Sequence, residues 1–456
     1  MSPLRTCSLS AGSARIPALA CALLCATAAR ADDTRYQDYP VGSRSLALGG
    51  AFVAFGDDPS GLTYNPAGIC DSRKINVSVS ASLYGFERQS QGAITVDKGT
   101  FTLATLNTLN VIPGEAGLVK SYGKLDDVGA PFAIGFDVTV PSFRAYGLDT
   151  TEPTRLHTRV VDRSFDAALG AAWRINERLN LGFGLHFVLR LFSQIEDALI
   201  TDGKADPKVG TYRAEATFAN SNLVAVLGAK LHLDDGWLAG AALGLPGIHL
   251  YSSGTVTIQD VVTDPAATPR TQFVFKDISG VRSNTTVPLL LRAGAAKVLP
   301  HHWTLSGQLT FHAPASYDRF ELPPDIQSRL RLQTHVERSA VLNLNLGGEY
   351  LLDKDWSFAV GAFTDFSSAP TLQSLADGTI VPGTSRLANV NLYGGTATVG
   401  MIGQHAISRF GMSIAYGTGE DAVANDPSGV FDAQGYTRAS VHQLFLYFFL
   451  ASTFRY

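Results

Sequence analysis

The 456-residue chain has 36 lysines and arginines against 40 aspartates and glutamates and no basic tract, which argues against nucleic acid as a partner. Only 17% of its residues are charged and 45% are hydrophobic, and its 44 glycines exceed the ordinary share. The longest uncharged stretch, residues 236–259, is broken by Gly240, Gly244, Pro246 and Gly247, so it does not predict a membrane-spanning helix.

Residues 1–31 are predicted to form a cleaved secretory signal. Arg5 and Arg15 precede an apolar run at residues 16–29, and Ala-Arg-Ala at residues 29–31 offers a cleavage site. Lipidation at Cys21 is the alternative, but the leucine usual three residues upstream is missing. Cleavage leaves 33 basic and 40 acidic residues, and Cys70 as the one cysteine, which excludes an intramolecular disulfide.

Residues 32–70 show no alternation of apolar and polar positions. The stretch GDDPSGLTYNPAG, residues 56–68, contains the turn-forming pairs Asp58-Pro59 and Asn65-Pro66 as well as three glycines. The sequence predicts a compact segment of small bulk before the first strand. The plainer interpretation of Asn65-Pro66 is an ordinary turn that starts that strand.

From residue 75 onward, apolar residues recur at every second position. In NLGFGLHFVLRLF, residues 180–192, one face carries only leucine and phenylalanine, whereas the other includes two glycines, His186 and Arg190. Alternation over about ten residues, repeated many times, is typical of a transmembrane β-barrel with one face toward lipid and one toward the lumen. We therefore predict an all-β protein whose residues 71–456 form an antiparallel transmembrane barrel.

Short and long connections alternate along this region. Short turns are predicted at residues 175–178, 234–236, 299–302, 352–355 and 403–405, and long polar loops at 197–213, 259–283, 319–329, 372–386 and 420–437. Short periplasmic turns and longer extracellular loops are typical of outer-membrane barrels. All four tryptophans stand beside short turns, where indole rings favour the membrane boundary: Trp173, Trp237, Trp303 and Trp356.

The pattern predicts about 14 strands, an even number as in single-chain bacterial barrels. They are expected near residues 75–87, 108–123, 132–147, 160–174, 179–195, 214–233, 237–257, 284–298, 303–317, 333–351, 356–370, 388–402, 405–419 and 440–456. A barrel of this size is wider than side chains alone can fill. Residues 32–70, tethered to the first strand, are therefore predicted to plug the lumen as a hatch.

Strand parity also predicts which side chains face the lumen. Phe445, Tyr447 and Phe449 of the last strand point inward and make that part of the wall apolar, unlike the wall of a water-filled porin. Three cations are turned inward as well: Arg190, Lys230 and Arg292. A buried cation would bind a ligand carboxylate, although pairing with an acidic residue of the wall is the commoner outcome. These six residues are the predicted substrate-binding set.

Several stretches together resemble the family of the long-chain fatty acid transporter FadL and the toluene transporters. The first is LGGAFVAFGDDPSGLTYNPAGI, whose Asn65, Pro66 and Ala67 match the Asn-Pro-Ala motif of that family's hatch and whose Asp57 and Asp58 match its acidic stretch. The others follow in order along nearly the whole mature chain: FRAYGLDT, AAWRINERLNLGFGL, LPGIHLYSSGTVTI, GGEYLLDKDWSFAVGAFTDFSSAP and FLYFFLASTFRY.

The resemblance implies a bacterial outer-membrane channel for passive uptake of hydrophobic molecules, such as long-chain fatty acids or hydrocarbons. It implies gating by the hatch and lateral exit into membrane lipids through a gap in the wall. Pro141 cannot donate to a strand ladder, so a bulge in the third strand, which also holds Tyr146 and Gly147, is the predicted gap. A harmless proline near the extracellular rim is the alternative. The aromatic end at Tyr456 resembles the signal for the barrel assembly machinery.

The chain also departs from the family, because the loops after the fifth and seventh strands look shorter and more polar than those of the fatty acid transporter. We expect a monomer with no cofactor and no metal site. A related hatch-bearing barrel that serves a secretion system as an adaptor or shuttle is the alternative function. An outer-membrane lipid hydrolase ranks lower, because Ser306 and His312 face the lumen and are too far apart along one strand to hydrogen-bond, at about 3.3 Å per residue.

Overall fold

The computed structural model describes residues 35–37, 39–80, 83–91, 94–96, 99–101, 106–112, 114–123, 130–150, 155–201, 209–299, 302–327, 333–381, 384–424 and 436–456. The predicted signal lies outside these residues. Within them, 18 strands form one antiparallel sheet, and two further hairpins stand apart from it. Among the described residues, no helix is long and apolar enough to cross a membrane.

The elements follow one another in this order. They are α2 (Ser43–Ala47), α3 (Gly61–Tyr64), the 3-10 helix η2 (Pro66–Asp71), β1 (Ile75–Ser80), β2 (Leu83–Gln91), β3 (Ile94–Val96), β4 (Gly99–Phe101), β5 (Leu106–Ile112), β6 (Ala116–Tyr122), β7 (Phe132–Thr150), β8 (Arg155–Arg174), β9 (Leu179–Thr201), β10 (Val209–His232), η3 (Asp234–Gly236), β11 (Trp237–Gly244), β12 (Ile248–Thr263), β13 (Thr271–Val281), β14 (Leu290–Val298), β15 (Trp303–His312), β16 (Ala315–Asp318), α4 (Pro324–Gln327), β17 (His335–Arg338), β18 (Val341–Leu351), β19 (Trp356–Asp365), β20 (Asn389–Ile402), β21 (Ala406–Ala424) and β22 (Tyr436–Arg455).

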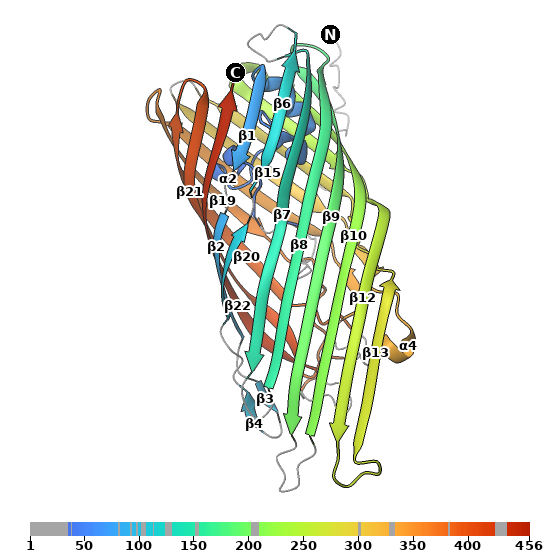
Figure 1. Cartoon of the computed structure of the whole chain (residues 1–456). Helices are drawn as coiled ribbons and strands as arrows, with labels where there is room; N and C mark the ends of the chain where they lie inside the picture. The colour runs from blue at the N-terminus through green and yellow to red at the C-terminus, as the bar shows by residue number, and fades with distance from the viewer. Residues whose placement is uncertain are drawn as a thin grey trace, which may run out of the picture.

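The sheet closes into a barrel (Figure 1). Four pairs of strands continue one another along the wall, β1 with β2, β5 with β6, β11 with β12 and β13 with β14, so the wall is 14 strands around. This confirms the predicted fold. At the closing seam β22 pairs with β1 and β2, and the backbones of Ile75 and Tyr456 exchange hydrogen bonds of 2.9 and 2.8 Å.

The outer face of the barrel is apolar at alternate positions. Leu181, Phe183 and Leu185 of β9 are 41%, 40% and 37% exposed, while the glycines between them face inward. All four tryptophans are exposed by 45% to 48%, and they lie beside the short connections at one rim. We call this the short-turn rim and the opposite end the long-loop rim.

The N-terminal segment lies inside the barrel. Figure 1 shows its helices, drawn in blue, within the wall near the end where the C-terminus lies. Leu46, Phe52 and Tyr64 are at most 2% exposed, although the segment has only short helices of four to six residues. Its burial therefore comes from the surrounding wall. We call the described residues up to Asp71 the hatch segment.

The lumen near the long-loop rim is filled differently. Between β16 and the end of α4, Phe320 and Ile326 are 2% and 3% exposed and pack in one apolar cluster with Phe192 and Phe218. The expected loop at residues 259–283 is largely a hairpin, because β12 continues to Thr263 and β13 begins at Thr271. Its outward positions are mostly polar, so the apolar alternation used for the prediction was absent there.

Candidate functional site: hatch seat, wall break and lumen cavity

Glycines of the wall make room for the hatch segment. A Cβ atom at Gly182 would overlap the backbone of Pro66 and Ala67, and one at Gly228 would overlap the side chain of Asn65. The same holds for glycines on six other strands. Together we call these residues the hatch seat: Gly117, Gly170, Gly182, Gly228, Gly240, Gly294, Gly347 and Gly361. Without side chains at these positions, the wall approaches the hatch segment at backbone distance.

Asn65 fixes the conformation of the hatch segment and ties it to the wall. Its side-chain oxygen accepts a hydrogen bond of 3.1 Å from the Ala67 amide, which caps η2, and Pro66 occupies the first position of that helix. Its Nδ2 donates to Val53 O at 2.8 Å and to Ala229 O of β10 at 2.9 Å. Asn65 is fully buried, so water cannot reach its side-chain amide. These hydrogen bonds within the protein satisfy that amide instead.

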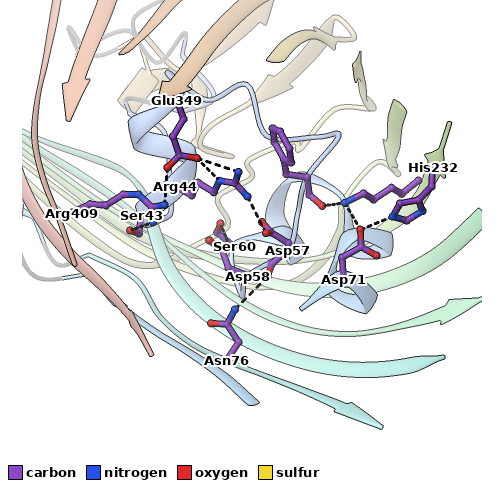
Figure 2. Close-up of polar contacts among 12 residues, drawn as sticks. Ser43, Arg44, Asp57, Asp58, Ser60, Asp71, Asn76, His232, Glu349 and Arg409 are labelled. Atoms are coloured by element: carbon purple, nitrogen blue, oxygen red, sulfur yellow. Dashed lines mark hydrogen bonds and ion pairs between the residues drawn. The ribbon is translucent and has the colours of Figure 1, made fainter. Parts of the chain in front are cut away.

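Buried charges hold one side of the hatch segment (Figure 2). Arg44 lies 3.0 Å from Asp57 and 3.1 Å from Glu349 of β18, and Arg409 of β21 reaches the other oxygen of Glu349 at 3.1 Å. The Ser60 hydroxyl donates to Asp58 at 2.6 Å. Asp57, Arg44, Glu349 and Arg409 thus form a network of alternating charges that joins the hatch segment to the wall.

The two adjacent aspartates titrate in opposite directions. Burial alone would raise the pKa of Asp57, but the Arg44 guanidinium, with smaller effects of Arg455 and Lys230, lowers that pKa to about 2. Burial raises the pKa of Asp58, and the neighbouring Asp57 carboxylate raises it further. Of the two aspartates, Asp57 is therefore the one that carries the negative charge of the ion pair with Arg44.

A second ionic cluster holds the end of the hatch segment (Figure 2). Lys230 of β10 lies 2.6 Å from Asp71 and donates to Phe55 O at 2.6 Å. His232 and Asn180 contact the same carboxylate at 2.8 Å each. Lys230, predicted to bind substrate, is 1% exposed and is used here for packing the hatch segment.

The inward aromatic residues of β22 also contact the hatch segment. Phe445, Tyr447 and Phe449 are 4%, 5% and 2% exposed and cluster with Tyr39 and Leu46. None of the three lines the lumen cavity described below. Their place beside the hatch segment suits sealing better than ligand contact.

The wall is interrupted at Pro141. β6 pairs with β7 only from Phe132 to Val138, and the register with β8 shifts between Thr139 and Ser142. Among the described residues no ladder joins the rest of β7 to β5. The Tyr39 hydroxyl of the hatch segment donates to Val140 O at this point.

The other residues predicted for this opening lie in regular pairing. The backbones of Tyr146 and Gly147 face Val160 and Arg159 of β8. Pro141 lies in the middle of β7, nine residues after its start, and the alternative of a proline at the rim does not describe it.

A cavity of about 210 Å³ lies between the hatch segment and this interruption. Thr63 of the hatch segment lines one side, and Pro141 and Ser142 line another. The remaining walls are mixed, with Val188, Val224, Val226, Val287 and Leu290 beside polar residues that include Asp162, Asp166, His186, Arg190 and Arg292. Such a lining suits a molecule with an apolar body and a polar end.

The two cavity arginines differ in their partners. Arg190 is paired with Asp162, with Nη2 and Oδ2 2.5 Å apart. Arg292 donates from Nη1 to Thr63 O at 2.5 Å and lies over the Tyr64 ring, 5.3 Å from its centroid. Among the described residues, no carboxylate comes within ion-pair distance of Arg292, which is 8% exposed. Arg292 is thus the cation of this set that is left for a ligand.

The arrangement around Ser306 and His312 does not resemble a hydrolytic site. The Ser306 hydroxyl donates to Ala51 O of the hatch segment at 2.6 Å, and the His312 ring stacks on Tyr36 with centroids 4.0 Å apart. Within the described ranges, no group of three or more histidine, cysteine or acidic side chains is placed to hold a metal ion.

Sequence reasoning missed the hatch seat and the partners of the buried cations. The glycines were visible as inward positions, for example Gly182 and Gly184 of β9, but what approaches them depends on the register of eight strands. A row of glycines at one level of the lumen is the signal that would have found the seat.

A family model and several solved structures are similar to this chain. The model of the outer membrane protein transport protein family (OMPP1/FadL/TodX) matches residues 22–245. No curated protein matches the sequence. Among solved structures, the chain is similar to a FadL homologue from Pseudomonas aeruginosa, at 11% identity and a TM-score of 0.62, over 92% of this chain and 99% of that one.

Two toluene transporters are similar as well. TodX of P. putida shares 15% identity and a TM-score of 0.56, over 91% of this chain and 99% of its own. TbuX of Ralstonia pickettii shares 14% identity and a TM-score of 0.52, over 91% and 98%. At these identities the likeness shows the fold.

Proposed function

Because the chain belongs to the FadL/TodX family of outer-membrane transport proteins, we propose that it admits hydrophobic small molecules into the outer membrane by passive diffusion. The protein is an outer-membrane β-barrel. In this proposal a molecule occupies the lumen cavity, the hatch segment closes the lumen toward the short-turn rim, and the molecule leaves sideways past Pro141.

The observation that carries the proposal is the position of the cavity. It has the hatch segment at Thr63 on one side and the interrupted wall at Pro141 and Ser142 on another. On its side away from β8, β7 pairs with no described strand beyond Val138. Opening the wall on that side therefore breaks no backbone pairing between described strands. A lateral exit at this edge is therefore cheaper in free energy than one through a continuous ladder.

Arg292 favours ligands that carry a carboxylate. A buried guanidinium without an acidic partner is costly, and a carboxylate would satisfy it with charge-assisted hydrogen bonds. Its present acceptor is Thr63 O of the hatch segment. A ligand that takes over Arg292 would remove that bond, so binding would loosen the hatch segment at the same step. Long-chain fatty acids are the substrates that this geometry favours over plain hydrocarbons.

Uptake measurements test the proposal. Cells whose only such transporter is this protein should take up labelled oleate in proportion to the amount of folded barrel, and less in the Asn65→Ala, Pro66→Ala variant. Arg292→Gln should raise the oleate concentration needed for half-maximal uptake and leave labelled toluene uptake unchanged. Arg178→Gln, at an exposed ion pair with Asp234, is the matched control.

The result also decides between the candidate functions. A correctly inserted barrel that takes up neither oleate nor toluene would support the adaptor or shuttle function instead. Equal loss of oleate and toluene uptake in Arg292→Gln would leave transport standing and remove the carboxylate assignment.

A further inference from the structure

A second interruption of the wall lies away from Pro141. β11 pairs with β14 from Trp237 to Gly244, and β12 pairs with β13 from Gly254 onward. Between these ladders, residues 248–253 of β12 pair only with β10, and the facing residues 282–289 form no strand. The wall there consists of one paired strand and one irregular segment.

Few bonds connect the two sides of this interruption. The Gly247 amide donates to Val287 O at 2.9 Å, and the Ser283 amide donates to Ser252 Oγ at 3.4 Å. The irregular segment is held to β10 by side chains, with Asn220 Nδ2 3.4 Å from Thr285 Oγ1 and Ser283 Oγ donating to Asn220 Oδ1 at 3.2 Å. Its backbone bonds run to the stretch between β15 and α4: Ala313 N donates to Leu289 O at 2.9 Å, Asn284 N to Arg319 O at 3.2 Å and Glu321 N to Arg282 O at 2.9 Å. The segment has no continuous ladder to β12, so parting it from β12 breaks fewer bonds than parting two laddered strands.

The outer surface at this place is apolar. Ile248, Leu250 and Tyr251 are 65%, 50% and 62% exposed, as are lipid-facing residues of laddered strands such as Leu169 at 58% and Phe410 at 59%. Beyond Tyr251 the outward positions of β12 become polar: Ser253, Thr255, Thr257 and Gln259. The interruption therefore lies where the apolar band ends toward the long-loop rim, and Tyr251 suits that boundary.

The inner surface at the same place is the lumen cavity. Thr285, Thr286, Val287 and Pro288 all line it. The cavity thus extends from Pro141 on one side of the barrel to residues 285–288 on another, and this short segment separates it from the apolar outer surface.

We propose that residues 248–253 and 282–289 form a second lateral window, through which apolar molecules dissolved in the outer leaflet enter the lumen cavity. The inference rests on the proposed uptake function and adds a route of entry to it. Entry from the membrane fits the rest of this half of the lumen, where Phe320 and Ile326 fill the space along the barrel axis. A molecule already in lipid reaches the cavity without crossing that apolar cluster.

Locking the window tests the proposal. A Ser252→Cys, Ser283→Cys pair, made in a Cys70→Ala background, should form a disulfide under oxidation that holds the irregular segment against β12. Oleate uptake should then be lost and should return with dithiothreitol. The control is Thr217→Cys, Thr255→Cys, where the two hydroxyls already lie 2.6 Å apart on the outer face of a regular ladder. Its oxidation should leave uptake unchanged.

A labelling experiment keeps the test independent of transport. The purified barrel in phospholipid vesicles is irradiated with a fatty acid that carries a diazirine at the end of its chain, and adducts are located by mass spectrometry. The window predicts adducts on residues 285–288 that are lost when the cysteine pair is oxidised. Oleate uptake that is unchanged by oxidation of the Ser252→Cys, Ser283→Cys pair would overturn the proposed window. The absence of adducts on residues 285–288 would overturn it as well. Adducts without uptake would support the window and contradict the proposed transport.

Discussion

In the half of the lumen near the short turns, the wall meets the hatch segment through glycines, buried ion pairs and the amide of Asn65. In the half near the long loops, Phe192, Phe218 and Phe320 fill the space through apolar contacts. The first kind of contact is directional and is satisfied in one position only, because buried donors and acceptors must be aligned to pair. The second tolerates rearrangement at small cost.

This difference suits two tasks. A segment that must seal a wide barrel and return to the same place after each opening needs contacts that specify one position. A region that borders the cavity and accommodates apolar molecules of varied shape needs contacts that another apolar group can replace. The cavity lies where the two halves meet, so its ligands contact both the polar ends of the first and the apolar side chains of the second.

The largest effect is expected from a substitution that prevents the hatch segment from packing against the hatch seat. Gly240→Ala places a methyl group where Val53 O and Ala54 Cα now lie, so the hatch segment cannot occupy its position. We expect a barrel that folds but conducts ions continuously in planar bilayers. Gly307→Ala is the control, because its methyl group would lie 3.3 Å from the flexible end of Leu346. Closed Gly240→Ala channels would show that the seat is not needed for sealing.

Removing Arg44, the cation that Asp57 and Glu349 share, should have the next largest effect. Arg44→Ala leaves Asp57 without its partner and Glu349 with Arg409 alone, and breaking a buried pair costs about 3–5 kcal/mol. We expect amide exchange of residues 43–71 to accelerate while exchange of the wall strands stays unchanged. Arg213→Ala, at a half-exposed pair with Asp197, should change neither. Equal acceleration in the wall would mean that Arg44 stabilises the barrel as a whole.

Acid should weaken the same contact. The folded pKa of Asp57 is about 2, below its usual 3.8, so its contribution is complete above about pH 5 and is lost as the pH falls toward 2. A shift of this size corresponds to about 2 kcal/mol at most. Exchange of the hatch segment, corrected for intrinsic rates, should therefore rise between pH 5 and pH 2.5. Asp57→Asn should lose this step; if it keeps the step, another group is responsible.

The smallest effect on sealing should come from the apolar half. Phe320→Ala removes a buried ring from the cluster with Phe218, and such a truncation costs about 3–5 kcal/mol locally. We expect no ion leak and unchanged exchange of the hatch segment, because the seat and its charges are untouched. Exchange near α4 should rise. A leak of the size found for Gly240→Ala would erase the distinction between the halves.

The fold was predictable because a lipid-facing strand must alternate. Five short turns, five long loops and about 14 strands followed from that pattern. The main error was the hairpin of β12 and β13, whose outward positions are mostly polar. Parity also turned Arg190, Lys230 and Arg292 inward. Their roles could not be predicted, because Asp162 and Asp71 reach them from a neighbouring strand and from the hatch segment, and only three-dimensional register brings them together.

The hydrogen bonds between Ile75 and Tyr456 join the first and last residues of the wall. This pairing has the largest sequence separation of the pairings between described wall strands, so its loop-closure entropy is the largest among them and we expect it to form late in folding. The hatch segment is attached directly before Ile75 and contacts strands all around the lumen. It must therefore lie between the strands before the seam closes, which makes it a core around which the cylinder is assembled as well as its later closure.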